Sequence, residues 1–321
     1  MKFKAPNPTP RGLCRRVPPA IFPPIMGLFG LGLAWRRAAG SYALPQALPD
    51  AILGAVTLLF LFAFGAYAIK VLRRPAVVAE EVRILPGRAG LAAAVLSIYL
   101  MSMAIFPFGA GLSRVVLFAG FGLHAALVLI LLVQLARGPA EQRRVTPVWH
   151  LNYVGFIIGA LAGTLHAYYM PAFGIFLASA LIAALIWAVS LEQLVKEDVP
   201  APLRPLLAIH LAPVALLGLV AAALELEAVS MGAAGVAALL LGWFVARGRW
   251  MTAAGFSPLW GAFTFPLAAT ASLWLTVGGG WRYPGTVVLV AATFVIPYIA
   301  FRILKTWATG ALAIKTNAAA A

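Results

Sequence analysis

The sequence predicts an all-α membrane protein in which ten transmembrane helices form five helical hairpins. Of its 321 residues, 63% are hydrophobic and only 10% are charged, whereas soluble domains have about 45–50% apolar and about 25% charged residues. Its single cysteine, Cys14, cannot form an internal disulfide. This composition excludes a soluble globular protein, a disordered chain and a disulfide-stapled secreted domain.

Ten apolar segments have about the length that a helix needs to cross the hydrocarbon core, roughly 20 residues. Charged residues or Gly and Pro separate them. The expected spans are 20–38, 51–71, 89–107, 114–136, 148–166, 172–194, 205–223, 229–247, 258–277 and 285–304. Because the connections are short, these spans are expected to form one transmembrane domain, 20–304, between an N-terminal segment, 1–19, and a C-terminal tail, 305–321.

Basic residues are divided unequally between the two sides that these spans define. Twenty of the 24 Lys and Arg residues fall on the side of the two termini, and Arg36, Arg37, Arg114 and Arg282 fall on the other. Cytoplasmic loops are rich in Lys and Arg, so a multi-pass protein of a bacterial inner membrane with both termini in the cytoplasm is expected. The net charge of +15 is then a solvated face beside anionic lipid rather than a nucleic-acid surface.

Proline and small residues are concentrated in alternate spans. The first, seventh and ninth spans contain proline, whereas the second, fourth, sixth and eighth lack internal proline and are rich in Leu and Phe. Proline frees a backbone carbonyl, which a membrane helix tolerates where protein or water can satisfy it. The odd spans also carry small residues at helical spacing, which tight helix packing alone could explain. Together the two patterns favour an inner ring of kinked helices around a narrow passage. Expected passage-lining residues are Pro23, Gly27, Gly30, Ser97, Asn152, Gly155, Gly159, Pro213, Pro266, Ala269 and Ser272.

Ionisable side chains are placed away from the centre of the expected membrane. All nine carboxylates lie at span ends or in loops, and no Lys or Arg lies at mid-span. Coupled transporters commonly carry an ionisable residue inside the bundle, so this absence favours passive conduction. Each of the four histidines is most simply a polar residue satisfied by a neighbouring helix, and His210 is the candidate for substrate contact. Neither metal-ligand spacing nor a catalytic motif occurs, so no metal, cofactor or enzymatic activity is expected.

The segment 256–266 carries the most specific motif, Phe-Ser-Pro-Leu-Trp-Gly-Ala-Phe-Thr-Phe-Pro. It resembles the ninth-helix motif of the tellurite-resistance/dicarboxylate transporter family, which includes the bacterial protein TehA and plant slow-type anion channels. The proline-rich start of the first span followed by Gly27 and Gly30, the Leu-Ala-Pro at 211–213, and the ten spans agree with this resemblance. The third span differs, since it lacks a mid-span proline.

The resemblance implies five hairpins about a quasi-fivefold axis, with odd helices lining a central pore and one pore in each protomer of a homotrimer. It also implies that Phe265, which precedes the ninth-span proline, plugs the pore as a gate. The expected partners are membrane lipid and small inorganic or organic anions, such as chloride, nitrate, sulfite-like oxyanions or dicarboxylates. No fixed cation is expected in the passage, so anion preference would come from helix ends, the basic cytoplasmic mouth and an apolar wall.

Three functions are compatible with the sequence. The first is a passive gated anion channel or facilitator. The second is a proton-coupled secondary transporter of dicarboxylates or oxyanions of the tellurite, sulfite or malate type, with His210 or His166 as proton relay. The third, a membrane scaffold without transport activity, is disfavoured by the proline-bearing inner helices.

Overall fold

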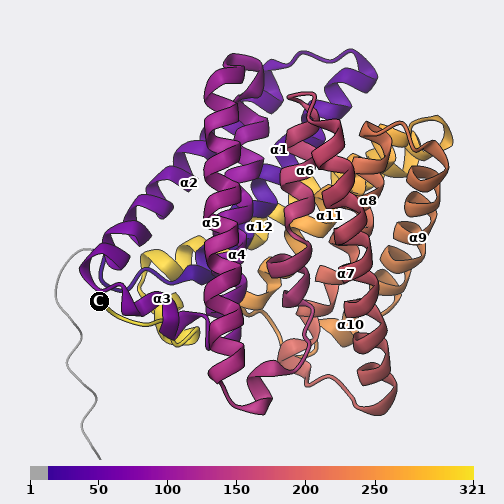
Figure 1. Cartoon of the computed structure of the whole chain (residues 1–321). Coiled ribbons are helices and arrows are strands. Elements are labelled where there is room, and N and C mark those ends of the chain that lie inside the picture. Colours follow the sequence, from indigo (N-terminus) through magenta and orange to yellow (C-terminus); the bar gives the residue numbers. More distant parts are fainter. Residues whose placement is uncertain (1–13) are drawn as a thin grey trace, which may run out of the picture.

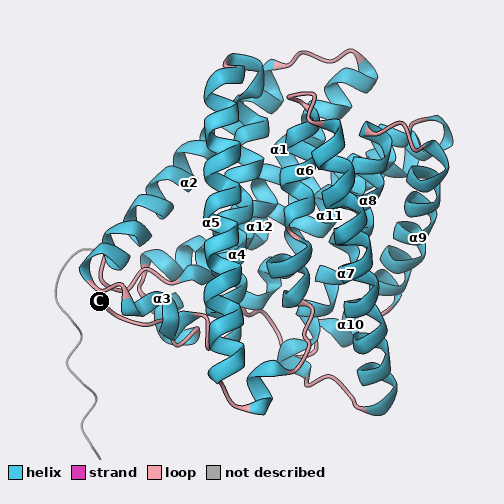
Figure 2. Ribbon diagram, viewed as in Figure 1, coloured by secondary structure: helices cyan, strands magenta, loops and turns pink. Residues whose placement is uncertain are grey.

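The computed structural model describes residues 14–321, which are helical apart from the connecting turns and contain no β-strand (Figures 1 and 2). Eight helices in this range are long and apolar enough to cross a membrane. The chain is therefore an all-α membrane protein, as the composition predicts. Residues 1–13, most of the expected N-terminal segment, lie outside the described residues.

Five long helices form the outer layer of the bundle. They are α2 (Ala47–Arg73), α5 (Ala110–Arg137), α7 (Tyr169–Lys196), α9 (Glu227–Ala246) and α12 (Arg282–Ala308). In each of them only 17–33% of the most apolar window is buried, so most of their Leu, Val and Phe side chains face outward. Such side chains suit contact with lipid. The five helices correspond to the even-numbered expected spans, which lack internal proline except for Pro297 in α12.

Five further helices form the inner layer. They are α1 (Phe22–Tyr42), α4 (Leu85–Ile105), α6 (Phe156–Thr164), α8 (Leu211–Ala223) and α11 (Thr264–Val277). The most apolar window is 83% buried in the segments that contain α4 and α8, and 67% buried in the one that contains α11. The alternation of small and large residues along the sequence thus corresponds to an alternation of buried and exposed helices.

Four inner helices are preceded by a segment of a different helix type. The 3₁₀ segments η1 (Pro19–Ile21), η5 (Ala201–His210) and η6 (Pro258–Phe263) precede α1, α8 and α11, and the π-helical turn η4 (His150–Val154) precedes α6. The spans expected at 148–166, 205–223 and 258–277 are therefore two-part helices rather than continuous ones.

The inner-helix prolines lie in the first turn of their α-helices. Pro24, Pro213 and Pro266 are each the third residue of an α-helix, in α1, α8 and α11. A first-turn N–H has no intrahelical acceptor, so proline loses nothing there. These prolines lie inside the expected spans, just after the point where a 3₁₀ segment gives way to an α-helix.

Packing closes the inner helices into a ring. Helix α1 contacts α4, α4 contacts α6, α6 contacts α8, α8 contacts α11, and α11 contacts α1. Each outer helix packs on the inner helix that precedes it and on the next one: α2 on α1 and α4, α5 on α4 and α6, α7 on α6 and α8, α9 on α8 and α11, and α12 on α11 and α1. The short helices α3 (Ala76–Glu81), α10 (Gly248–Met251) and α13 (Ala311–Lys315) lie in the connections and the C-terminal region.

The inner helices run in parallel, from the lower to the upper part of Figure 1. The two ends of the ring are named the N-terminal end and the C-terminal end after the ends of these helices. At the N-terminal end, Lys70 of α2 and Glu81 of α3 form a fully buried ion pair. Tyr67 donates to Glu81 Oε2 at 2.5 Å, and Lys70 Nζ donates to the Val17 carbonyl at 2.8 Å. This cluster joins α2 and α3 to the segment that leads into α1.

Helix α1 packs closely on α11 at Gly27, where an added Cβ would overlap the Thr264 side chain. Replacing Gly27 with Ala is therefore expected to destabilise the protein by about 1–3 kcal/mol, because the two helices must separate. Thermal unfolding in detergent measures this effect. Gly54→Ala on the exposed face of α2, where an added Cβ meets nothing within 4 Å, is the matched control. Equal melting temperatures for the two variants would contradict the packing described.

Candidate functional site

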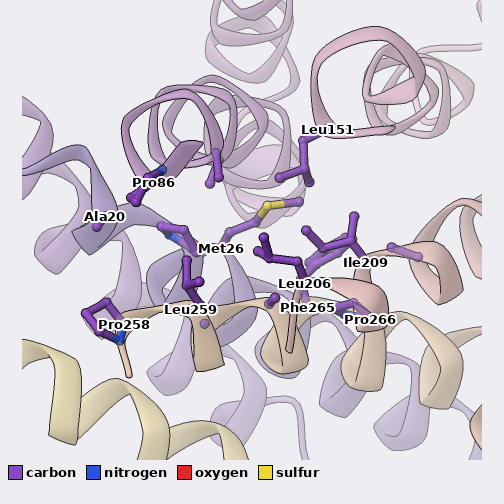
Figure 3. Close-up of a pocket in the computed structure, with 16 residues that line it drawn as sticks. Ala20, Met26, Pro86, Leu151, Leu206, Ile209, Pro258, Leu259, Phe265 and Pro266 are labelled. Atoms are coloured by element: carbon purple, nitrogen blue, oxygen red, sulfur yellow. The ribbon is translucent and has the colours of Figure 1, made fainter. Parts of the chain in front are cut away.

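A cavity opens into the inner ring from each end, and Phe265 lies in the wall of both. The C-terminal cavity has a volume of about 340 Å³ and is lined by residues of all five inner helices, among them Gly30, Leu100, Leu161, Leu216 and Phe265. The N-terminal cavity is narrower, about 40 Å³, and also has residues of all five inner segments in its wall (Figure 3). Since each cavity touches every member of the ring, both lie along its axis.

Phe265 is the second residue of α11 and is only 6% exposed. Its ring packs on the backbone of α1, where a Cβ at Gly30 would lie 3.1 Å from Phe265 Cδ2. A small space of about 20 Å³ next to the ring is lined by Phe265 together with Met26, Leu151 and Ile209. The same four side chains also line the N-terminal cavity shown in Figure 3.

The part of the axis between Phe265 and the N-terminal end of the ring is uniformly apolar. The lining of the N-terminal cavity contains Ala, Pro, Met, Leu, Ile, Gly and Phe residues and no charged side chain. Narrow apolar constrictions exclude water as well as blocking larger solutes, and this is how hydrophobic gates close channels. The axis is therefore narrow and apolar on the N-terminal side of Phe265.

Seven of the expected lining residues border the two axial cavities or the small space beside Phe265. Ala269 and Ser272 follow Phe265 by four and seven residues on one face of α11 and line the C-terminal cavity, as does Gly30. The others are at the N-terminal cavity and in the small space beside Phe265: Pro23 and Pro266 in the former, and Gly155 and Pro213 in the latter.

The other four expected lining residues do not border these cavities. Gly27 packs on Thr264, and a Cβ at Gly159 would lie 2.7 Å from the Phe121 ring. The Ser97 hydroxyl donates to the Ala93 carbonyl at 2.7 Å, and the Asn152 amide donates to the Val148 carbonyl at 3.0 Å. Small residues on an inner helix therefore also serve contacts with its neighbours.

The absence of a fixed cation from the passage is an expectation that the C-terminal cavity contradicts. Arg36 and Arg37 both line this cavity. The span expected at 20–38 placed them at the helix end, but α1 continues to Tyr42, so both arginines lie inside the helix. The sequence pattern gave no sign of this extension, because Arg36 and Arg37 resemble the charged border of a span.

The two arginines differ in their partners. Arg36 donates to Asp50 at 2.7 Å and to the carbonyls of Met103 and Ala104 near the end of α4. It thereby neutralises a carboxylate and the negative end of a helix. Arg37 has neither a hydrogen bond nor an ion pair with any residue of the described range.

His124 hydrogen-bonds to the backbone of the π-helical turn. Its Nε2 lies 3.0 Å from the Asn152 carbonyl oxygen, so this nitrogen carries the proton and donates. Its Nδ1 then accepts from the Tyr99 hydroxyl at 3.3 Å. This confirms, for His124, a polar residue satisfied by a neighbouring helix.

His210 does not border the axial cavities. Its Nδ1 lies 3.0 Å from Nε2 of His150. The two histidines are 60 residues apart in the sequence, so their contact could not be predicted from their spacing. His150 lines the small space beside Phe265, whereas His210 lines an off-axis cavity of about 700 Å³ between α7, α8 and α9. His210, the candidate for substrate contact, therefore lies outside both axial cavities.

A ring of buried helices with an axial cavity from each end is the arrangement of a membrane channel or transporter. Residues 16–304 match the family model SLAC1, described as voltage-dependent anion channel, so the chain belongs to this family. The match confirms the family that the 256–266 motif indicates. A search of the curated proteins finds no match to the chain.

Proposed function

We propose that the protein is a passive, gated anion channel or facilitator of the bacterial inner membrane, with Phe265 as its gate. The observation that carries the proposal is the position of Phe265 in the walls of both axial cavities. Removing one ring would join these cavities, because the Phe265 side chain contributes to the walls of both. Family membership supports anions as the transported class.

The proposed membrane arrangement has ten crossings, with α1 and the η4–α6 segment added to the eight long apolar helices. The repeated packing of one outer helix on two successive inner helices supports a quasi-fivefold axis. The excess of Lys and Arg at the N-terminal end supports cytoplasmic termini, with segment 1–19 and tail 305–321 on that side. A homotrimer with one pore per protomer is part of the proposal and rests on the family resemblance.

Anion preference has two sources in this arrangement. Basic residues at the cytoplasmic end concentrate anions there, and Arg37 adds a positive charge within the opposite cavity. With the cell interior negative, each unit of negative charge gains about 2.3 kcal/mol per 100 mV on leaving. Net export of small anions such as chloride or nitrate is therefore the expected direction.

A proton-coupled transporter of dicarboxylates or oxyanions is the second candidate, and the His150–His210 pair favours it. This pair joins the space beside Phe265 to the off-axis cavity and could relay a proton. Reversal potentials measured with and without a pH gradient separate the two functions. For a channel, we expect the reversal potential to follow the anion gradient alone and to stay unchanged in His210→Gln. A shift with the pH gradient that His210→Gln abolishes would establish coupling instead.

A further inference from the structure

We propose that Arg37 is an anion-binding residue of the C-terminal cavity and holds a small halide or oxyanion above the Phe265 gate. The consequence for conduction rests on the proposed function. Binding itself does not, and it can be measured separately in the closed protein.

Arg37 lies on the face of α1 that lines the C-terminal cavity. Gly30, Leu33 and Arg37 are spaced at i, i+3 and i+7, so they share one helix face, and all three line the cavity. Gly30 is the residue on which the Phe265 ring packs. Seven residues of α-helix rise about 10 Å, so the Arg37 backbone lies about 10 Å beyond the gate toward the C-terminal mouth.

The charge of Arg37 is uncompensated. The ionisable groups in the cavity wall are Arg36 and Arg37, and the nearby carboxylate, Asp50, is bound by Arg36. A guanidinium partly removed from water is costly without a counter-charge. A mobile anion supplies that charge, and a cavity of about 340 Å³ has room for one with some of its water.

Ser272 offers a second donor to the same cavity. It lies two turns beyond Phe265 on α11, it is 5% exposed, and its hydroxyl forms no hydrogen bond within the described range. Arginine donates two parallel hydrogen bonds to oxyanions, so nitrate-like and sulfate-like anions fit this wall, and halides bind by charge alone.

Binding is tested by thermal unfolding of the purified protein in sodium nitrate and in sodium gluconate of equal ionic strength. A ligand that binds the folded state stabilises it, and we expect nitrate to raise the melting temperature by about 2 °C in the wild type. Arg37→Gln should lose this shift, and Arg37→Lys should keep part of it. Arg114→Gln, an exposed arginine on α5 outside the cavity wall, should keep all of it. An equal shift in Arg37→Gln and the wild type, or none in the wild type, would overturn the proposal.

The consequence for conduction is tested in the Phe265→Ala background. At low salt, Arg37→Gln is expected to lower unitary chloride conductance about threefold, because the charge no longer raises the local anion concentration. The difference should vanish near 1 M salt, where charges are screened within about 3 Å. Conductance that is insensitive to Arg37 at low salt overturns the role in conduction. Absence of any anion current in Phe265→Ala refutes the proposed function, while the nitrate shift still decides whether Arg37 binds anions.

Discussion

Replacing Phe265 with Ala is expected to raise anion flux about tenfold or more, which corresponds to a barrier lower by about 1.4 kcal/mol. The ring lies in the walls of both axial cavities and of the small space beside it. Truncation to a methyl group joins the cavities and widens a throat whose apolar wall excludes water. Chloride efflux from liposomes that contain the purified protein measures the change.

Phe263→Ala is the matched control for this experiment. Phe263 lies two residues earlier in the same motif, but it lines an off-axis space next to α9 and α12 rather than the axial cavities. Its truncation is expected to leave flux close to that of the wild type. Equal flux from Phe265→Ala and Phe263→Ala, at equal protein incorporation, would remove Phe265 from the role of gate.

Replacing Lys70 with Met should be among the most destabilising changes in the described chain, at about 3–5 kcal/mol, because it leaves Glu81 buried without its partner. Both side chains are fully buried. The same change frees the Val17 carbonyl, which Lys70 holds at 2.8 Å. Thermal unfolding in detergent should show a large drop in melting temperature and early loss of the packing at the N-terminal end.

The exposed pair Lys196–Glu192 provides the comparison. Its side chains are 67% and 62% exposed, so Lys196→Met should cost less than about 1 kcal/mol. Changing Lys70 to Met together with Glu81 to Leu should recover much of the loss, since no buried charge remains unpaired. A Lys70→Met protein as stable as Lys196→Met would show that the buried pair contributes little.

The division into inner and outer helices could be predicted from the sequence because it depends on side-chain size and polarity alone. Outer helices such as α5 and α7 face outward over most of their length and tolerate bulky apolar side chains, while inner helices must approach one another closely. The 3₁₀ and π segments could not be predicted in this way. They depend on tertiary partners, as when His124 satisfies the Asn152 carbonyl.

The wall of the passage could be predicted only in part. A small residue on an inner helix is equally suited to a cavity wall and to a helix contact, and only packing separates Gly30 from Gly27. Charge shows the same limit, because Arg36 and Arg37 are adjacent and identical in type. Their difference arises from Asp50 and the end of α4, which reach Arg36 alone.

A planar-bilayer recording of the purified wild type beside Phe265→Ala, under a chloride gradient, tests the central claim most directly. We expect small or no currents in the wild type and a large current in Phe265→Ala that reverses at the chloride equilibrium potential. A current that reverses at the cation equilibrium potential, or a silent Phe265→Ala protein that is folded and inserted, would contradict an anion path closed by this ring.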